Sequence, residues 1–136
     1  MSKSPAEILA SAKTIAMVGA SPNPDRPAYG VMRYLMRAGY RVIPVRPLDC
    51  DEVCGIPCVA TLAEIDEPID LVDVFRNVDA CPGHVEEAVD VGAAAVWLQL
   101  GLVSPESRRI ATEAGLDYVE DECTAVVHRL ELAAKA

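Results

Sequence analysis

The chain has 136 residues, of which 51% are hydrophobic, and it carries 12 basic against 21 acidic side chains, a formal charge of −9. This length suits a single domain with a buried core. The negative charge argues against a nucleic-acid partner, whose phosphates need a basic face. Neither a secretory signal nor an apolar stretch of membrane-spanning length is present, so we expect a cytoplasmic protein without a membrane partner.

Short apolar runs alternate with helical patterns along the chain. We expect residues 1–12 to form a helical lead-in to one domain over residues 13–136. The apolar runs predict five buried strands, at residues 14–18, 41–45, 71–75, 95–98 and 116–119. Helical spacing, or start and stop signals such as Ser-Pro-Glu and glycine, predicts helices over residues 31–39, 62–65, 85–92, 104–115 and 124–133. A further short strand is expected near residues 58–59.

Strands that alternate with short helices predict βαβ units and hence a parallel sheet. Runs such as residues 96–98 are apolar throughout, which is typical of strands covered on both faces. Pro44 suits such a strand only where the strand frays or where its missing N–H is not needed. The expected fold is a three-layer α/β sandwich with a five-stranded parallel sheet. Ligands bind beyond the carboxyl ends of such strands, so the loops that follow them are the candidate site.

The loop after the first strand begins Gly19-Ala20-Ser21. Gly19 allows a tight turn, and small side chains let a ligand approach the backbone. The next helix would direct its free N–H groups and partial positive charge at that ligand. Ser21 adds a hydroxyl group, and Arg26 adds a positively charged guanidinium group. These features suit a pyrophosphate. Taken alone, they are better explained by an ordinary strand-to-helix turn, and the GxGxxG fingerprint of NAD sites is absent.

The second strand ends with Val45-Arg46-Pro47, where NAD-binding chains place an acidic residue. Arg46 would instead attract a phosphate on the ribose, which both NADP and coenzyme A carry. Without evidence from neighbouring residues, a solvated surface charge is the favoured interpretation. Arg76 follows the third strand and Gln99 the fourth, so both are expected at the same edge of the sheet.

The remaining candidate groups indicate no catalytic set. Cys123 precedes a helix that could lower its pKa, but two acidic neighbours oppose this effect. Asp73 lies within an apolar run and is expected to bond nearby backbone groups. Neither a Ser-His-Asp nor a Cys-His order stands out. Three cysteines have a spacing of no common zinc or iron–sulfur site, so chance placement is favoured over a metal site: Cys50, Cys54 and Cys58.

Five stretches, from residue 13 to about residue 129, together resemble the small stand-alone coenzyme A-binding proteins. These proteins have a single Rossmann-like domain related to the N-terminal domain of the succinyl-CoA synthetase α-subunit. The matching stretches are VGAS at 18–21, RPAYGV at 26–31, GYRVIPVRP at 39–47, DLVDVFR at 70–76 and AVWLQLG at 95–101.

The resemblance implies a Rossmann-like fold and coenzyme A or an acyl-CoA as the ligand. The loop after the first strand, with its helix, should hold the pyrophosphate. The end of the second strand should hold the adenosine end, and the end of the third should border the ligand. The residues implied at the ligand are Gly19, Ala20, Ser21, Arg26, Tyr29, Gly30, Val45, Arg46, Pro47, Phe75 and Arg76.

The chain departs from the family at Arg46, where an asparagine is usual, and at residues 121–123, where Asp-Glu-Cys replaces Asp-Arg-Cys. The phosphorylated histidine of the full synthetase belongs to a second domain, and we expect His84 at the surface instead. Because no catalytic set is visible, we expect a coenzyme A-binding module or sensor with no catalytic residues and no metal. The alternatives are an NADP(H)-binding oxidoreductase or redox sensor, and a purely interacting protein. A homodimer, which would cover a sheet edge, stays open.

Overall fold

A computed structural model describes residues 3–47 and 51–133 of the chain. Its main sheet has five parallel strands in the order β2-β1-β5-β6-β7. A second, two-stranded sheet is formed by β3 and β4. The strands are β1 (Thr14–Val18), β2 (Arg41–Val45), β3 (Glu52–Val53), β4 (Ile56–Pro57), β5 (Leu71–Val74), β6 (Ala95–Leu98) and β7 (Asp117–Val119).

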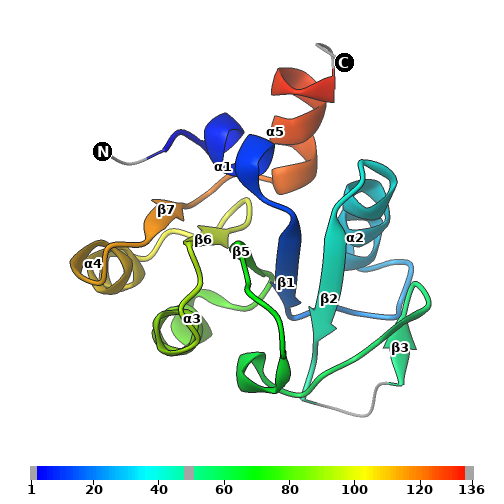
Figure 1. Ribbon diagram of the computed structural model, residues 1–136, viewed down its shortest axis with the longest axis horizontal. Helices are drawn as coiled ribbons and strands as arrows, with labels where there is room; N and C mark the ends of the chain where they lie inside the picture. Colours follow the sequence, from blue (N-terminus) through cyan, green and yellow to red (C-terminus); the bar gives the residue numbers. More distant parts are fainter. Residues whose placement is uncertain (1–2, 48–50, 134–136) are drawn as a thin grey trace.

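Helices cover both faces of the main sheet (Figure 1). Helices α1, α2 and α5 pack on one face, and α3 and α4 pack on the other. This arrangement confirms the predicted three-layer sandwich with a five-stranded parallel sheet. The helices are α1 (Pro5–Ser11), α2 (Pro27–Arg37), α3 (Cys81–Asp90), α4 (Pro105–Glu113) and α5 (Thr124–Glu131), with 3₁₀ turns η1 (Leu62–Glu64) and η2 (Val78–Ala80).

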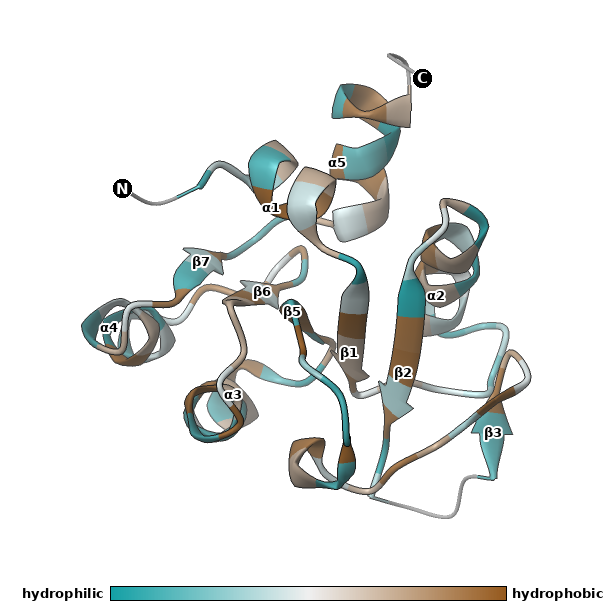
Figure 2. Cartoon of the chain, viewed as in Figure 1, coloured by the Kyte–Doolittle hydropathy of each residue, from teal (hydrophilic) through white to brown (hydrophobic). Residues whose placement is uncertain are grey.

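The central strands are apolar because both of their faces are covered. Successive β1 side chains alternate between the two cores: Ile15 and Met17 face the layer of α1, α2 and α5, while Ala16 and Val18 face α3 and α4. Figure 2 shows apolar colouring along the middle of β1 and β2 and polar colouring on parts of the helices. Trp97 of β6 is fully buried in the first of these cores.

Local sequence signals explain where several helices begin. The Ser104 hydroxyl accepts a hydrogen bond from the Ser107 backbone N–H at 3.1 Å, and Pro105 occupies the first turn of α4. Helix α1 begins with a capping box in which Ser4 and Glu7 bond each other's backbone N–H. The predicted start of α4 is therefore confirmed. Helix α1 packs against α5, and its buried Ile8 joins the core.

The edge position of β2 explains how this strand contains a proline. The Pro44 carbonyl accepts a hydrogen bond from the Val59 N–H at 3.0 Å, on the side away from β1. Because the N–H and C=O of one residue point to the same side of a strand, the missing N–H of Pro44 interrupts no bond to β1. The short strand expected near residues 58–59 is a single parallel bridge between Val45 and Val59.

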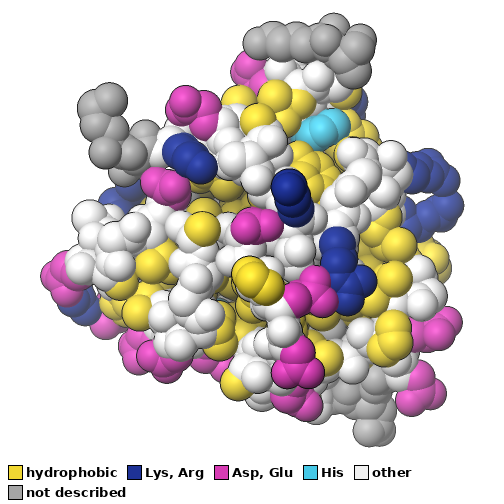
Figure 3. All heavy atoms as spheres, viewed as in Figure 1, with side chains coloured by type: hydrophobic (Ala, Val, Ile, Leu, Met, Phe, Trp, Pro, Cys, Tyr) yellow, Lys and Arg dark blue, Asp and Glu magenta, His cyan; other side chains and the backbone are white. Residues whose placement is uncertain are grey.

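The surface agrees with the acidic composition. On the face shown in Figure 3, basic side chains lie singly or in small groups among acidic and apolar ones. Among the described residues, no helix is long and apolar enough to cross a membrane.

Candidate functional site

A cavity of about 970 Å³ opens at the carboxyl ends of the parallel strands. The chain passes from β1 outward to β2 and later returns to pair β5 on the other side of β1, so the strand order reverses at this point. Loops after β1, β2, β5 and β6 form the walls, together with the starts of α2, α3 and α5. Of the residues predicted at the ligand, those lining the cavity are Gly19, Ser21, Arg26, Val45, Arg46, Pro47, Phe75 and Arg76.

Gly19 forms the turn that closes β1 at the strand reversal. Its φ of +86° lies in the left-handed region, and its N–H donates to the Val45 carbonyl of β2 at 3.1 Å. On the other side, the Phe75 N–H donates to the Val18 carbonyl at 2.8 Å. A Cβ added to Gly19 would lie 2.9 Å from the Phe75 carbonyl carbon and closer still to its oxygen. Only glycine lets the three strand ends meet this closely.

The loop between β1 and α2 is organised by its own polar groups. The Ser21 hydroxyl accepts from the Asn23 N–H at 3.1 Å, and the Asn23 side chain accepts from the Asp25 N–H at 2.9 Å. Within the described part of the chain, no side chain caps the first turn of α2, which begins with Pro27. The positive end of this helix is therefore left uncapped at the cavity wall.

Three arginines line the cavity, from the loops after β1, β2 and β5. Arg46 is half-buried, and one of its terminal nitrogens donates to the Ala20 carbonyl at 3.1 Å. The Nε of Arg46 is buried and has no hydrogen-bond partner among the described residues. Arg26 and Arg76 are exposed and also line the cavity. The cavity thus concentrates positive charge in a chain that is acidic overall.

Gln99, which lines the cavity, belongs to a buried polar network. Gln99 Nε2 donates to Asp73 Oδ1 at 2.6 Å and to Thr124 Oγ1 at 3.0 Å, and the Thr124 hydroxyl donates to Asp73 Oδ2 at 3.0 Å. Complete burial raises the pKa of Asp73 to about 7, although both hydrogen bonds act in the opposite direction. The expectation that Asp73 bonds nearby backbone groups is therefore wrong. The two partners are side chains from other elements.

The network extends to the start of α5. The Trp97 indole N–H donates to the Glu122 carbonyl at 2.7 Å, which ties β6 to the loop before this helix. Cys123 and Val126 from this region line the cavity together with Gln99 and Leu100 of the β6 loop. Cys123 is a free thiol of intermediate burial.

Several predicted residues do not line the cavity. Ala20 is fully buried and contributes its carbonyl to Arg46. Tyr29 packs against the core, and Gly30 is exposed on α2. Sequence reasoning also missed lining residues: His84, expected at the surface, faces the cavity near the start of α3 and bonds Glu87 at 2.7 Å. The sequence did place His84 in the helix that follows the third strand, and this was the signal that could have indicated a position at the cavity.

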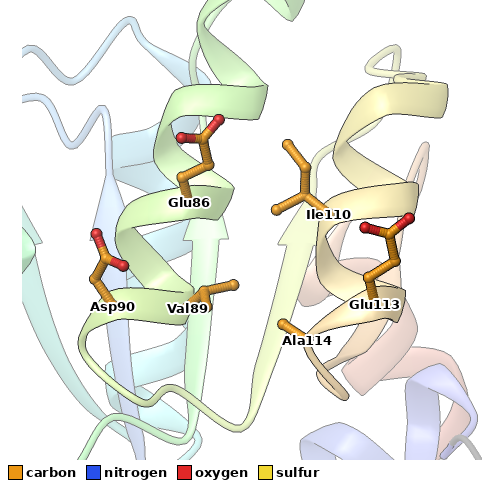
Figure 4. Close-up of a pocket in the computed structure, with 6 residues that line it drawn as sticks. All are labelled: Glu86, Val89, Asp90, Ile110, Glu113 and Ala114. Carbon is orange, nitrogen blue, oxygen red and sulfur yellow. The ribbon is translucent and has the colours of Figure 1, made fainter.

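A second hollow, of about 400 Å³, lies between α3 and α4. Figure 4 shows apolar Val89 and Ile110 between the two helices, with the carboxylates Glu86, Asp90 and Glu113 around them. Three carboxylates would repel an anionic ligand, so this hollow is not the candidate phosphate site.

The structure describes two of the three cysteines whose spacing was compared with metal sites. Cys50 lies outside the described residues. Cys54 is a free thiol, whereas Cys58 is disulfide-bonded. Among the described residues, no group of three or more His, Cys, Asp or Glu side chains is placed to hold a metal ion.

Comparison with known proteins places this geometry in context. A curated protein of Bacillus subtilis (strain 168), the uncharacterized protein YneT, is 43% identical over 122 residues, which is 90% of each chain. A hypothetical protein from Pyrococcus horikoshii OT3 has a similar structure, with a TM-score of 0.91 and 40% identity over 95% of this chain and 90% of that one.

A more distant relative is larger. The ADP-forming acetate–CoA ligase of Methanocaldococcus jannaschii is 30% identical over 75 residues, which is 55% of this chain and 10% of that protein. The model of one family, described as the CoA binding domain, matches residues 13–129. The chain therefore belongs to the CoA binding domain family.

Proposed function

We propose that the cavity at the carboxyl ends of the strands binds coenzyme A or an acyl-CoA, and that the chain acts as a binding module without chemistry of its own. The observation that carries this proposal is the convergence of Arg26, Arg46 and Arg76 on one cavity of about 970 Å³ in a chain of net charge −9. Membership of the CoA binding domain family supports the same ligand.

Each part of the cationic end has a role in this proposal. The turn at Gly19 and Ser21, with the uncapped start of α2, would hold the pyrophosphate, because backbone N–H groups at a helix start favour anions. Arg46 and Pro47 would border the phosphorylated ribose and adenine. The unpartnered Nε of Arg46 supports this assignment, since a buried donor without a partner is costly unless a ligand satisfies it.

The name of one relative points to the same chemistry. The ligase of Methanocaldococcus jannaschii is named for joining acetate to CoA, and the present chain is similar to 10% of that protein. A module of this kind would hold the CoA without the remaining machinery. We therefore expect mass spectrometry to recover an acyl-CoA intact after incubation with the protein.

The direct test is calorimetric titration with coenzyme A. We expect micromolar binding, and we expect Arg46→Glu to weaken it at least tenfold, since a charge-assisted hydrogen bond contributes about 1.5–3 kcal/mol. Arg37→Glu is the matched control, because Arg37 is an exposed α2 residue outside the cavity and the change in charge is the same. Strong NADP binding without CoA binding would overturn the proposal in favour of an NADP(H)-dependent redox protein.

A further inference from the structure

The cavity has two chemically different sides. We propose that its β6 side accepts an apolar acyl group, so that the site prefers acyl-CoAs with a hydrocarbon chain to those whose chain ends in a carboxylate. This inference rests on the proposed function and adds the class of acyl group to it.

The strand order separates the two sides in space. The arginines follow β1, β2 and β5, whereas Gln99 and Leu100 follow β6, and Cys123 precedes α5. From β2, which Arg46 follows, to β6 there are three strand spacings of about 4.8 Å, or roughly 14 Å along the sheet edge, whereas Arg76 follows β5, one spacing from β6. A ligand whose phosphates lie among the arginines must extend along this edge to bring its other end to β6.

Apolar side chains line the β6 side and are left uncovered by the chain. Leu100 is 72% exposed and Val126 is 38% exposed, and both line the cavity with the partly buried Leu102. Val31 of α2 also lines the cavity. When a hydrocarbon group covers exposed apolar surface at a ligand cavity, that surface is removed from water, which favours binding.

A hydrogen bond holds together the two helices that supply this wall. Tyr34 of α2 and His128 of α5 are joined at 2.9 Å through the phenol oxygen and Nδ1, and their rings pack edge to face. Val31 lies one turn before Tyr34, and Val126 lies two residues before His128. Val31 and Val126 therefore belong to helices that pack against each other.

Several hydrogen-bond donors on this side are already used within the chain. Both amide hydrogens of Gln99 are used by Asp73 and Thr124, which leaves its Oε1, an acceptor, for the ligand. The Gly101 N–H donates to Asp121 at 2.7 Å, and the Leu102 N–H donates to the Gln99 carbonyl at 3.0 Å.

The charges near the β6 side are also unfavourable to an anion. The positive end of α5 lies here, but the acidic residues 121 and 122 precede its N-cap, Cys123, and oppose its field, while Glu120 is paired with Arg108 at 3.2 Å. No basic side chain from β6, β7 or α5 is among the described lining residues. An acyl chain that ends in a carboxylate would lose hydration here and meet no basic side chain of β6, β7 or α5 among the described lining residues.

Butyryl-CoA and succinyl-CoA provide a matched pair of probes, because both acyl chains have four carbons and only the second ends in a carboxylate. In calorimetric titrations, we expect butyryl-CoA to bind about fivefold more tightly than CoA, roughly what the burial of one to two methylene groups provides. Succinyl-CoA should bind no more tightly than CoA.

A charge on the apolar wall should reverse this preference. Val126→Arg should bind succinyl-CoA more tightly than butyryl-CoA. Leu130→Arg, one turn further along α5 at a position 65% exposed and outside the cavity, should keep the wild-type order. Both sites are exposed, so neither change should unfold the chain.

The outcomes separate the two proposals. Equal affinities for CoA and both acyl-CoAs, or a wild-type preference for succinyl-CoA, would overturn the acyl inference and leave CoA binding in place. A Val126→Arg variant with the wild-type order would also overturn it. Failure of CoA and both acyl-CoAs to bind would overturn the proposed function itself.

Discussion

Replacing Gly19 by alanine tests how the strand ends meet at the cavity. The new Cβ would clash with the Phe75 carbonyl, which is backbone and has no rotamer with which to move away. The left-handed backbone costs about 1–2 kcal/mol for a residue with a side chain. Crowding against a packed neighbour adds about 1–3 kcal/mol. We expect Gly19→Ala to lower the free energy of unfolding by about 2–5 kcal/mol.

Gly115→Ala is the matched control for this experiment. Gly115 has a similar φ of +82°, but an added Cβ would meet no atom within 4 Å, so only the backbone cost of about 1–2 kcal/mol remains. Urea unfolding followed through the fluorescence of Trp97, the single tryptophan and fully buried, measures both variants. Equal losses of stability in the two variants would show that the steric argument at Phe75 is wrong.

Two further predictions concern a buried carboxyl group and a helix cap. Between the ordinary pKa of Asp73, 3.8, and its raised value of about 7, the folded state binds more protons than the unfolded state, so stability falls as pH rises through this range. Asp73→Asn removes this pH dependence. Urea titrations should therefore show that the free energy of unfolding of the variant, relative to wild type, rises by about 2 kcal/mol from pH 5 to pH 7. If the two proteins depend on pH in the same way, the raised pKa of Asp73 is wrong. Ser104→Ala removes the hydroxyl that caps α4 and should cost about 1 kcal/mol. Thermal unfolding followed by circular dichroism measures that loss, and an unchanged melting temperature would count against the cap.

Periodic patterns made the main elements predictable. The apolar runs at residues 14–18, 41–45 and 95–98 match β1, β2 and β6, because a strand covered on both faces must be apolar throughout. The hairpin of β3 and β4 was missed: each strand has two residues, too few to show any alternation. A strand this short leaves no periodic signal in the sequence.

The site was less predictable because it depends on distant pairings. Strand ends could be located from the sequence, so the loops after β1, β2 and β5 could be named. The partners of Asp73 could not, since Gln99 and Thr124 lie 26 and 51 residues away along the chain. Likewise, no local pattern in the sequence indicates that Arg46 donates a hydrogen bond to the Ala20 carbonyl.

The cavity wall draws on residues as far apart as Val18 and Val126, which belong to the first strand and the last helix of the described chain. A molecule bound there would contact both the first strand and the last helix. Unfolding of either element would then require the ligand to dissociate first. Occupancy at a hundred times the dissociation constant would add about 2.7 kcal/mol to the stability of the whole domain, and slower amide exchange should then reach α5 as well as β1.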